Sequence, residues 1–213
     1  MKIKKIFLSL LLLILLCGCT NINKLTYDDI INTLSLKAKN PNEYKKGYQF
    51  YVPKGLLVEK SGTNYTILSS NEINYYLYVD LVSYHNKNNI GYERKENLIY
   101  SEIIKYENKI GYAEIKLLEN NKYLIEIMYN YAKIEVMVEE NLIKNALVNS
   151  ISILNSVQYN DSAIERMLND DELSYTEENY ELFDEDKSNS NILNSSDEEV
   201  EEKEEIKDTD YVN

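Results

Sequence analysis

The chain has 213 residues, a net charge of −13, two cysteines and one histidine. Both cysteines, Cys17 and Cys19, stand near the start, so the rest of the chain forms no internal disulfide and depends on its apolar core. A single histidine excludes histidine-pair metal sites, and the six glycines never approach the spacing of a phosphate-binding loop. We therefore expect no cofactor.

The negative charge is concentrated at the C-terminal end. Residues 170–213 hold 18 acidic and three basic residues, which leaves +2 on residues 1–169. Such a segment, poor in apolar residues, is typical of a disordered acidic tail. It is expected to act as a solvated spacer, or alternatively to bind a partner or gather calcium weakly. The nearly neutral remainder shows no basic patch, which argues against nucleic acid.

The first residues are typical of an export signal. Lysines at positions 2, 4 and 5 precede the apolar run Ile6–Leu16. This run fits a secretory apolar region of ~7–15 residues and falls short of the ~20 that a membrane-spanning helix needs. The residues that follow, Leu16, Cys17, Gly18 and Cys19, resemble the lipobox of bacterial lipoproteins.

The lipobox resemblance implies removal of residues 1–18 as a signal peptide and transfer of a diacylglyceryl group to the Cys19 thiol. Fatty acids such as palmitate would then hold the protein on the extracytoplasmic face of the cell membrane. Two acyl chains suffice, because each buried methylene contributes ~0.8 kcal/mol. Residues 19–25 would form a tether. The alternative is an uncleaved N-terminal membrane anchor.

A helix is expected at the start of the mature domain. Thr26 and Asp29 have the spacing of a capping box, and Pro41 forbids continuation, so the helix should run from about Tyr27 to Lys39. A second and longer helix is expected from Glu139 to Val157, where apolar residues recur at intervals of three and four.

Between the helices the pattern predicts strands at 48–52, 56–60, 65–69, 73–84, 98–106, 110–118 and 123–138. The last is too long for one strand and should divide near Asn130. The segment 73–84 alternates an aliphatic face with a face that carries the candidate binding residues Tyr76, Tyr78 and Tyr84. The polar stretch His85–Glu96 is expected to be a loop.

This order of elements predicts an α+β fold. An antiparallel sheet of about six or seven strands, covered by an N-terminal and a C-terminal helix, should occupy residues 26–160. A short helix or linker at 161–169 would join it to the acidic tail.

A weaker resemblance concerns the segment from Gly47 to Gly55 and the closing residues Leu154, Ser156 and Val157. Both are similar to the opening strand and turn, and to the end, of domains in the PsbP and Mog1 group. The resemblance covers about 39–159, although Leu56 stands where such domains often have tryptophan. It implies a non-catalytic adaptor or assembly domain.

Candidate catalytic residues are few. His85 is the one imidazole that could act as a base, and its polar neighbours predict a solvated side chain. Asp80 with Glu102, Glu114 or Glu126 could form the carboxylate pair of a wall-polymer hydrolase. Glutamates that alternate with apolar residues along a strand, however, favour a solvent-exposed sheet face. We expect a membrane-anchored envelope lipoprotein that is not an enzyme and binds an envelope protein or glycan. The alternatives are a structural surface lipoprotein without a ligand or, remotely, that hydrolase.

Overall fold

The computed structural model describes residues 22–71, 73–170 and 173. The chain divides into two compact units, Met1–Glu177 and Glu178–Asn213, and every described residue belongs to the first. The predicted signal peptide and nearly all of the predicted acidic tail lie outside the described residues.

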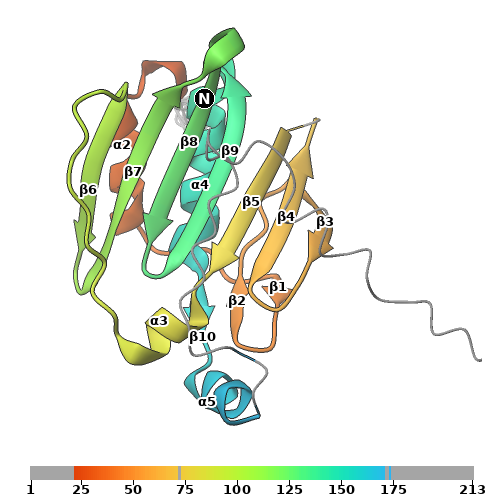
Figure 1. Ribbon diagram of the computed structural model, residues 1–213. Helices are drawn as coiled ribbons and strands as arrows, with labels where there is room; N and C mark the ends of the chain where they lie inside the picture. Colours follow the sequence, from red (N-terminus) through yellow and green to blue (C-terminus); the bar gives the residue numbers. More distant parts are fainter. Residues whose placement is uncertain (1–21, 72, 171–172, 174–213) are drawn as a thin grey trace, which may run out of the picture. The chain divides into compact units, whose positions relative to one another are not determined.

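One antiparallel sheet of seven strands forms the domain (Figure 1), with the strand order β3-β4-β5-β9-β8-β7-β6. Its strands are β3 (Leu57–Ser61), β4 (Tyr65–Ser70), β5 (Ile73–Val79), β6 (Tyr100–Tyr106), β7 (Lys109–Leu117), β8 (Lys122–Tyr129) and β9 (Ala132–Glu139). A smaller sheet joins β1 (Glu43–Tyr44), β2 (Tyr48–Phe50) and β10 (Gln158–Tyr159). The predicted α+β class and antiparallel sheet are confirmed.

Helices cover one face of the large sheet, behind the strands in Figure 1. They are α2 (Tyr27–Ile31), continued by the 3-10 turn η2 (Asn32–Ser35), and α4 (Ile143–Ser156), preceded by η4 (Glu140–Leu142). The Asn149 side chain of α4 donates a hydrogen bond to the Tyr75 hydroxyl of β5. A further 3-10 turn, η3 (Glu119–Asn121), joins β7 to β8.

The first helix starts as predicted but ends early. The Thr26 side chain and Asp29 form the expected capping box. The α-helix ends at Ile31 rather than near Lys39, because the hydroxyls of Thr33 and Ser35 donate to the carbonyls of Ile30 and Asn32 and favour a 3-10 turn. Before it, the turn η1 (Ile22–Lys24) and Leu25 pack against the core, so this part of the expected tether belongs to the domain.

The predicted strand 73–84 is wrong in its second half. β5 ends at Val79, and Leu81–Asn86 form the helix α3. Asp80 caps this helix, since its carboxylate accepts a 2.8 Å hydrogen bond from the Ser83 amide. His85 consequently lies in the last turn of α3 and not in the loop predicted from His85 onward.

The predicted division of the long strand near Asn130 is confirmed. Asn130 and Tyr131 both adopt positive φ, 52° and 64°, and form the tight turn between β8 and β9. Asparagine accepts this conformation more readily than most residues, which places the turn there.

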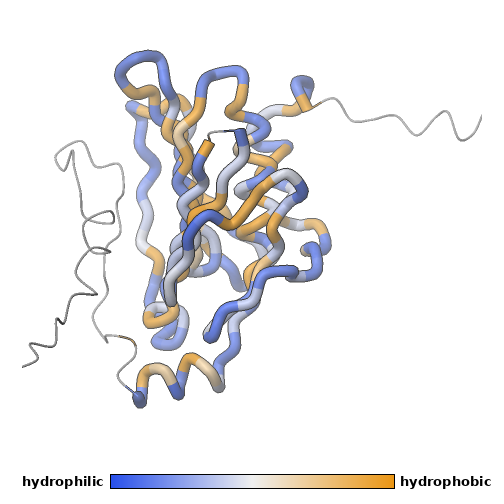
Figure 2. The backbone as a smooth tube through the Cα atoms, turned by 90° about the vertical axis from the view of Figure 1, so that its right-hand side faces the viewer, coloured by the Kyte–Doolittle hydropathy of each residue, from blue (hydrophilic) through white to orange (hydrophobic). Residues whose placement is uncertain are grey.

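The core lies between the covered sheet face and the helices, and it continues into α5 (Asp161–Asn169). In Figure 2 the orange apolar stretches of α5 alternate with blue polar ones at the lower end of the domain. Ile164 and Met167 are fully buried, and Leu173 is 8 % exposed. The short helix expected at 161–169 is thus present as α5, and its apolar side chains belong to the core of the domain.

Candidate functional site

The candidate site is the sheet face that the described helices leave uncovered, which faces the viewer in Figure 1. We call it the open face. Strand register places its residues in rows that run across the sheet, because alternate side chains of each strand share a face. Its central members are Tyr65, Ile67, Tyr76, Tyr78, Tyr112, Glu114, Glu126, Met128, Lys133 and Glu135.

Three glutamates occupy one row. Glu126 lies opposite Glu114 on one side and Glu135 on the other. Like charges in directly opposed positions destabilise a sheet unless other groups neutralise them. Each of the three carboxylates has a different partner, and the partners keep the row stable.

The irregular segment between α3 and β6 supplies the partners of Glu114. The Tyr92 hydroxyl donates a 2.7 Å hydrogen bond to its carboxylate, and Lys95 Nζ lies 2.8 Å from the same oxygen. The Tyr92 ring stacks on Tyr112 with centroids 4.2 Å apart. Glu114 is therefore only 8 % exposed, although it belongs to the open face.

The partners of the other two glutamates come from within the sheet: a tyrosine hydroxyl for Glu126 and a lysine for Glu135. The Tyr112 hydroxyl donates a 2.6 Å hydrogen bond to Glu126, and Lys133 Nζ lies 2.7 Å from Glu135. Burial, followed by the nearby Glu126, raises the pKa of Tyr112 well above its ordinary value, and burial raises the pKa of Tyr92 to about 12. Both phenols remain hydrogen-bond donors at neutral pH.

Two of the three predicted binding tyrosines lie together beside this row. Tyr76 pairs with Glu135 across the sheet, and Tyr78 pairs with Lys133. Tyr65 and Ile67 of β4 are their neighbours on the far side. All four side chains are partly buried, so an aromatic and apolar area adjoins the charged row.

The third tyrosine lies elsewhere. Tyr84 belongs to α3, where its ring stacks on Tyr159 at 3.7 Å and its hydroxyl donates a 2.9 Å hydrogen bond to Asp161. Lys87 Nζ lies 3.6 Å from the Tyr84 ring centroid. Burial, with Asp161 next, raises its pKa to about 12. Tyr84 thus joins α3 to α5. It does not lie on the open face, because β5 ends at Val79 and the alternation of side chains between the two sheet faces ends there.

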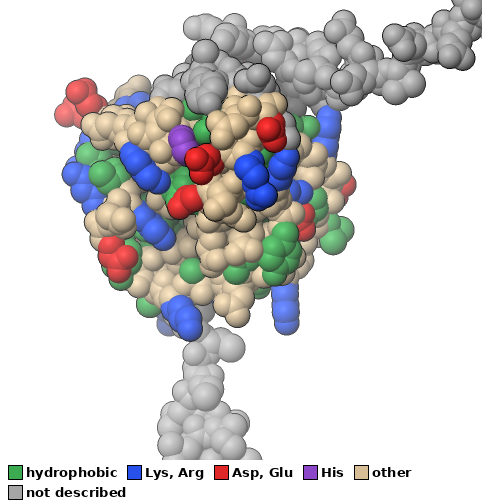
Figure 3. Space-filling view, turned by 90° about the horizontal axis from the view of Figure 1, so that it is seen from below, with side chains coloured by type: hydrophobic (Ala, Val, Ile, Leu, Met, Phe, Trp, Pro, Cys, Tyr) green, Lys and Arg blue, Asp and Glu red, His purple; other side chains and the backbone are tan. Residues whose placement is uncertain are grey.

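The candidate carboxylates come together only in part. Glu114 and Glu126 are neighbours, whereas Asp80 caps α3 and Glu102 forms an ion pair with Arg94. Within residues 22–71, 73–170 and 173, no group of three His, Cys, Asp or Glu side chains could hold a metal ion. His85, purple in Figure 3, is exposed on the surface.

Cys19 and the rest of the lipobox lie outside the described residues, so lipid attachment stays a prediction. In the part of the chain that the structure describes, no helix is long and apolar enough to cross a membrane.

The comparisons with known proteins give no family for this chain. No protein-family model matches it, and no curated protein matches it. The resemblances to lipoproteins and to the PsbP and Mog1 group therefore rest on the chain's own residues.

The sequence reasoning missed Tyr92 and Lys95. Both lie in a polar stretch whose sequence predicts only a loop, and their partner Glu114 is about twenty residues away along the chain. The one available signal is an aromatic residue, Tyr92, within an otherwise polar segment. It did not identify the partner.

Proposed function

We propose that this chain is a lipid-anchored protein of the cell envelope whose α+β domain binds a partner and catalyses no reaction. The lipobox resemblance of Leu16–Cys19 supports the anchor. The resemblance of about 39–159 to the PsbP and Mog1 group supports a binding or assembly role.

The single observation that carries the proposal is the chemistry of the open face. Tyr76, Tyr78 and Met128 lie beside Glu126, which accepts a tyrosine hydrogen bond, and Glu135, which pairs with a lysine. Tyrosine and methionine are enriched at protein interfaces, and a hydrogen bond or ion pair already in place offsets part of the cost of removing water from a carboxylate. A face of this kind suits recognition better than proton transfer.

A hydrolase is the weaker candidate. Glu114 and Glu126 are the neighbouring carboxylates that such an enzyme would use, and each accepts a hydrogen bond from a tyrosine hydroxyl. These hydrogen bonds engage both carboxylates with side chains of the domain itself, whereas a glycosidase needs two carboxyl groups that flank a bound substrate.

Site-directed photocrosslinking in cells tests the binding proposal. A benzophenone analogue of phenylalanine replaces Tyr78 on the open face or, as control, Tyr44, which is 68 % exposed on β1. We expect a discrete adduct with an envelope component from position 78 and none from position 44. Equal labelling, or none from either position, would favour a structural surface lipoprotein without a ligand.

Replacement of the lipid-bearing residue tests the anchor. Cys19→Ala should release the protein from membranes or leave an unprocessed precursor, because no thiol remains for diacylglyceryl transfer. Metabolic labelling with a radioactive fatty acid should then disappear. Label retained by the Cys19→Ala protein would contradict the lipoprotein assignment.

A further inference from the structure

The two edges of the large sheet differ. At the β3 edge the pairing with β4 shifts register between Val58 and Lys60, and such an irregularity discourages a further strand from pairing. At the other edge, β6 pairs with β7 without a break from Tyr100 to Tyr106. The β6 edge is therefore the better template for an added strand.

The register shows which backbone groups of β6 are available. Within β7 the Ile110 carbonyl accepts from the Asn130 amide on the β8 side, whereas the Ile115 carbonyl accepts from the Ile99 amide on the β6 side. Because amides alternate in direction along a strand, Tyr100, Glu102 and Ile104 bond to β7. The amides and carbonyls of Ile103 and Lys105 point outward, and no hydrogen bond from another described residue reaches them.

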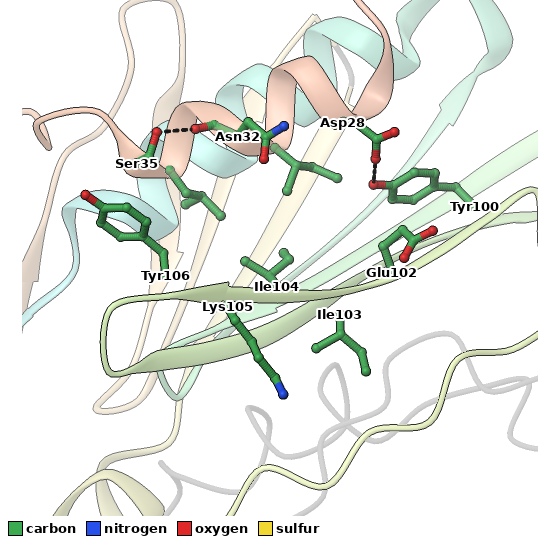
Figure 4. A pocket seen from close by; sticks show the side chains of 11 residues that line it. Asp28, Asn32, Ser35, Tyr100, Glu102, Ile103, Ile104, Lys105 and Tyr106 are labelled. Carbon is green, nitrogen blue, oxygen red and sulfur yellow. Dashed lines mark hydrogen bonds between the residues drawn. The ribbon is translucent and has the colours of Figure 1, made fainter.

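A groove of about 200 Å³ lies beside this edge, between β6 and the first helix (Figure 4). The buried side chains of Ile31, Leu34 and Ile104 form its apolar floor. Figure 4 shows Ile104 pointing toward the helix, while Ile103 and Lys105 point away from it. Ile103 is 44 % exposed.

The groove is acidic at one end. The exposed Asp28 accepts a 2.6 Å hydrogen bond from the Tyr100 hydroxyl, and Glu102 lies next to Tyr100 in the lining. Burial, followed by the hydrogen bond to Asp28, raises the Tyr100 pKa, so the phenol remains a donor. Arg94 pairs with Glu102 from outside, and Lys105, the one lysine of the lining, points away.

We propose that the β6 edge and this groove bind an extended peptide segment of a partner protein by strand addition. The backbone groups of Ile103 and Lys105 supply main-chain hydrogen bonds, the floor takes an apolar side chain, and Asp28 pairs with a basic one. The groove's acidity disfavours the chain's own segment 170–213, which carries 18 acidic residues. This inference rests on the proposed binding function and assigns it a second site.

The test begins with the full-length protein in detergent micelles and a phage library of random octapeptides. We expect enriched peptides with alternate apolar residues and a nearby lysine or arginine. The best peptide is then synthesised, labelled with a fluorophore and titrated by fluorescence anisotropy.

Ile103→Pro removes the outward amide, and an edge strand tolerates proline where the amide faces solvent. We expect affinity to fall about tenfold or more, which corresponds to about 1.4 kcal/mol. Ile103→Ala is the matched control, because it shortens the same side chain and keeps the amide. Asp28→Asn should lower the affinity for peptides with a basic residue and leave the affinity for their neutral analogues unchanged. Circular dichroism and thermal melting check that each variant is folded.

Three outcomes would overturn the inference. Absence of any enriched peptide would exclude this ligand class. Peptide binding that survives Ile103→Pro and is lost in Tyr78→Lys would place recognition on the open face, which leaves the proposed function intact. A dimer seen by analytical ultracentrifugation and abolished by Ile103→Pro would show that a second copy of this chain occupies the edge.

Discussion

The two faces of the large sheet are formed by the same strands but differ in composition: the covered face is apolar and the open face is rich in charged and aromatic residues. Along β8, Ile125, Ile127 and Tyr129 face the helices and are fully buried, while Glu126 and Met128 face the open side. The covered face contains the buried Tyr129 hydroxyl, which has no hydrogen-bond partner among the described residues, whereas each glutamate of the row on the open face has a hydroxyl or a lysine as its partner.

The difference indicates where stability and recognition reside. The covered face contributes through apolar burial, which is large enough to tolerate an unpaired hydroxyl costing about 1–3 kcal/mol. On the open face each glutamate of the row is held by a hydroxyl or a lysine. Such contacts add little net stability, but they fix the side chains in position. Substitutions at adjacent positions of one strand should therefore have very different costs.

The largest effect is expected at Ile127. Ile127→Ala should lower the free energy of unfolding by about 4 kcal/mol, because it leaves a cavity in a fully buried part of the core. The neighbouring Met128→Ala, on the open face, should cost about 1 kcal/mol or less. Urea denaturation followed by circular dichroism measures both, and equal costs would contradict the division between the faces.

Lys133→Met should have the next largest effect. It removes the cation 2.7 Å from Glu135 and leaves a carboxylate whose side chain is 3 % exposed. Breaking a fully buried pair costs ~3–5 kcal/mol, and we expect about 2 kcal/mol here because Lys133 is partly exposed. The double variant Lys133→Met, Glu135→Gln should recover most of the loss in the same denaturation assay. No recovery would show that Lys133 acts through packing.

Alkaline pH should destabilise the open face through its tyrosines. The pKa of Tyr92 is raised to about 12 and that of Tyr112 is raised further, whereas tyrosines of the unfolded chain ionise near 10. The unfolded state therefore loses protons first, and stability should fall as pH rises above 10. Urea midpoints at successive pH values measure the fall. Tyr112→Phe should make it shallower, and an unchanged slope would exclude Tyr112 as a cause.

The smallest effect is expected at His85, which belongs to neither face. His85→Ala should change the free energy of unfolding by no more than about 0.5 kcal/mol, because the side chain is exposed. The cellular phenotype should also be unchanged. A folded His85→Ala protein that behaved like a deletion strain would reopen a catalytic role for this histidine.

Local signals were sufficient for much of the fold. The capping box at Thr26 and the turn at Asn130 both depend on residues that are neighbours in sequence, and both were predicted. The switch from β5 to α3 was missed because Leu81 and Val82 continue an apolar strand pattern. Asp80 as a helix cap was the available signal.

The open face was harder to predict because its contacts are long-range. Alternation placed Tyr76 and Tyr78 on one face, but it could not show that β7, β8 and β9 align their glutamates in one row. That alignment depends on strand register. The same holds for the groove beside β6, whose two walls come from segments about seventy residues apart.

The central strand pair also constrains how the protein folds. β5 and β9 are neighbours in the sheet, yet their paired residues lie 53 to 61 positions apart in the chain. The hairpin β3-β4 and strand β5 can form early, but β5 lacks its second neighbour until residue 139 is available. The large sheet can therefore close only after the whole of β9 is available. Until then the early strands present an unpaired edge, so the long-range pairing of β5 with β9 is the step at which the folding chain is most exposed to aggregation.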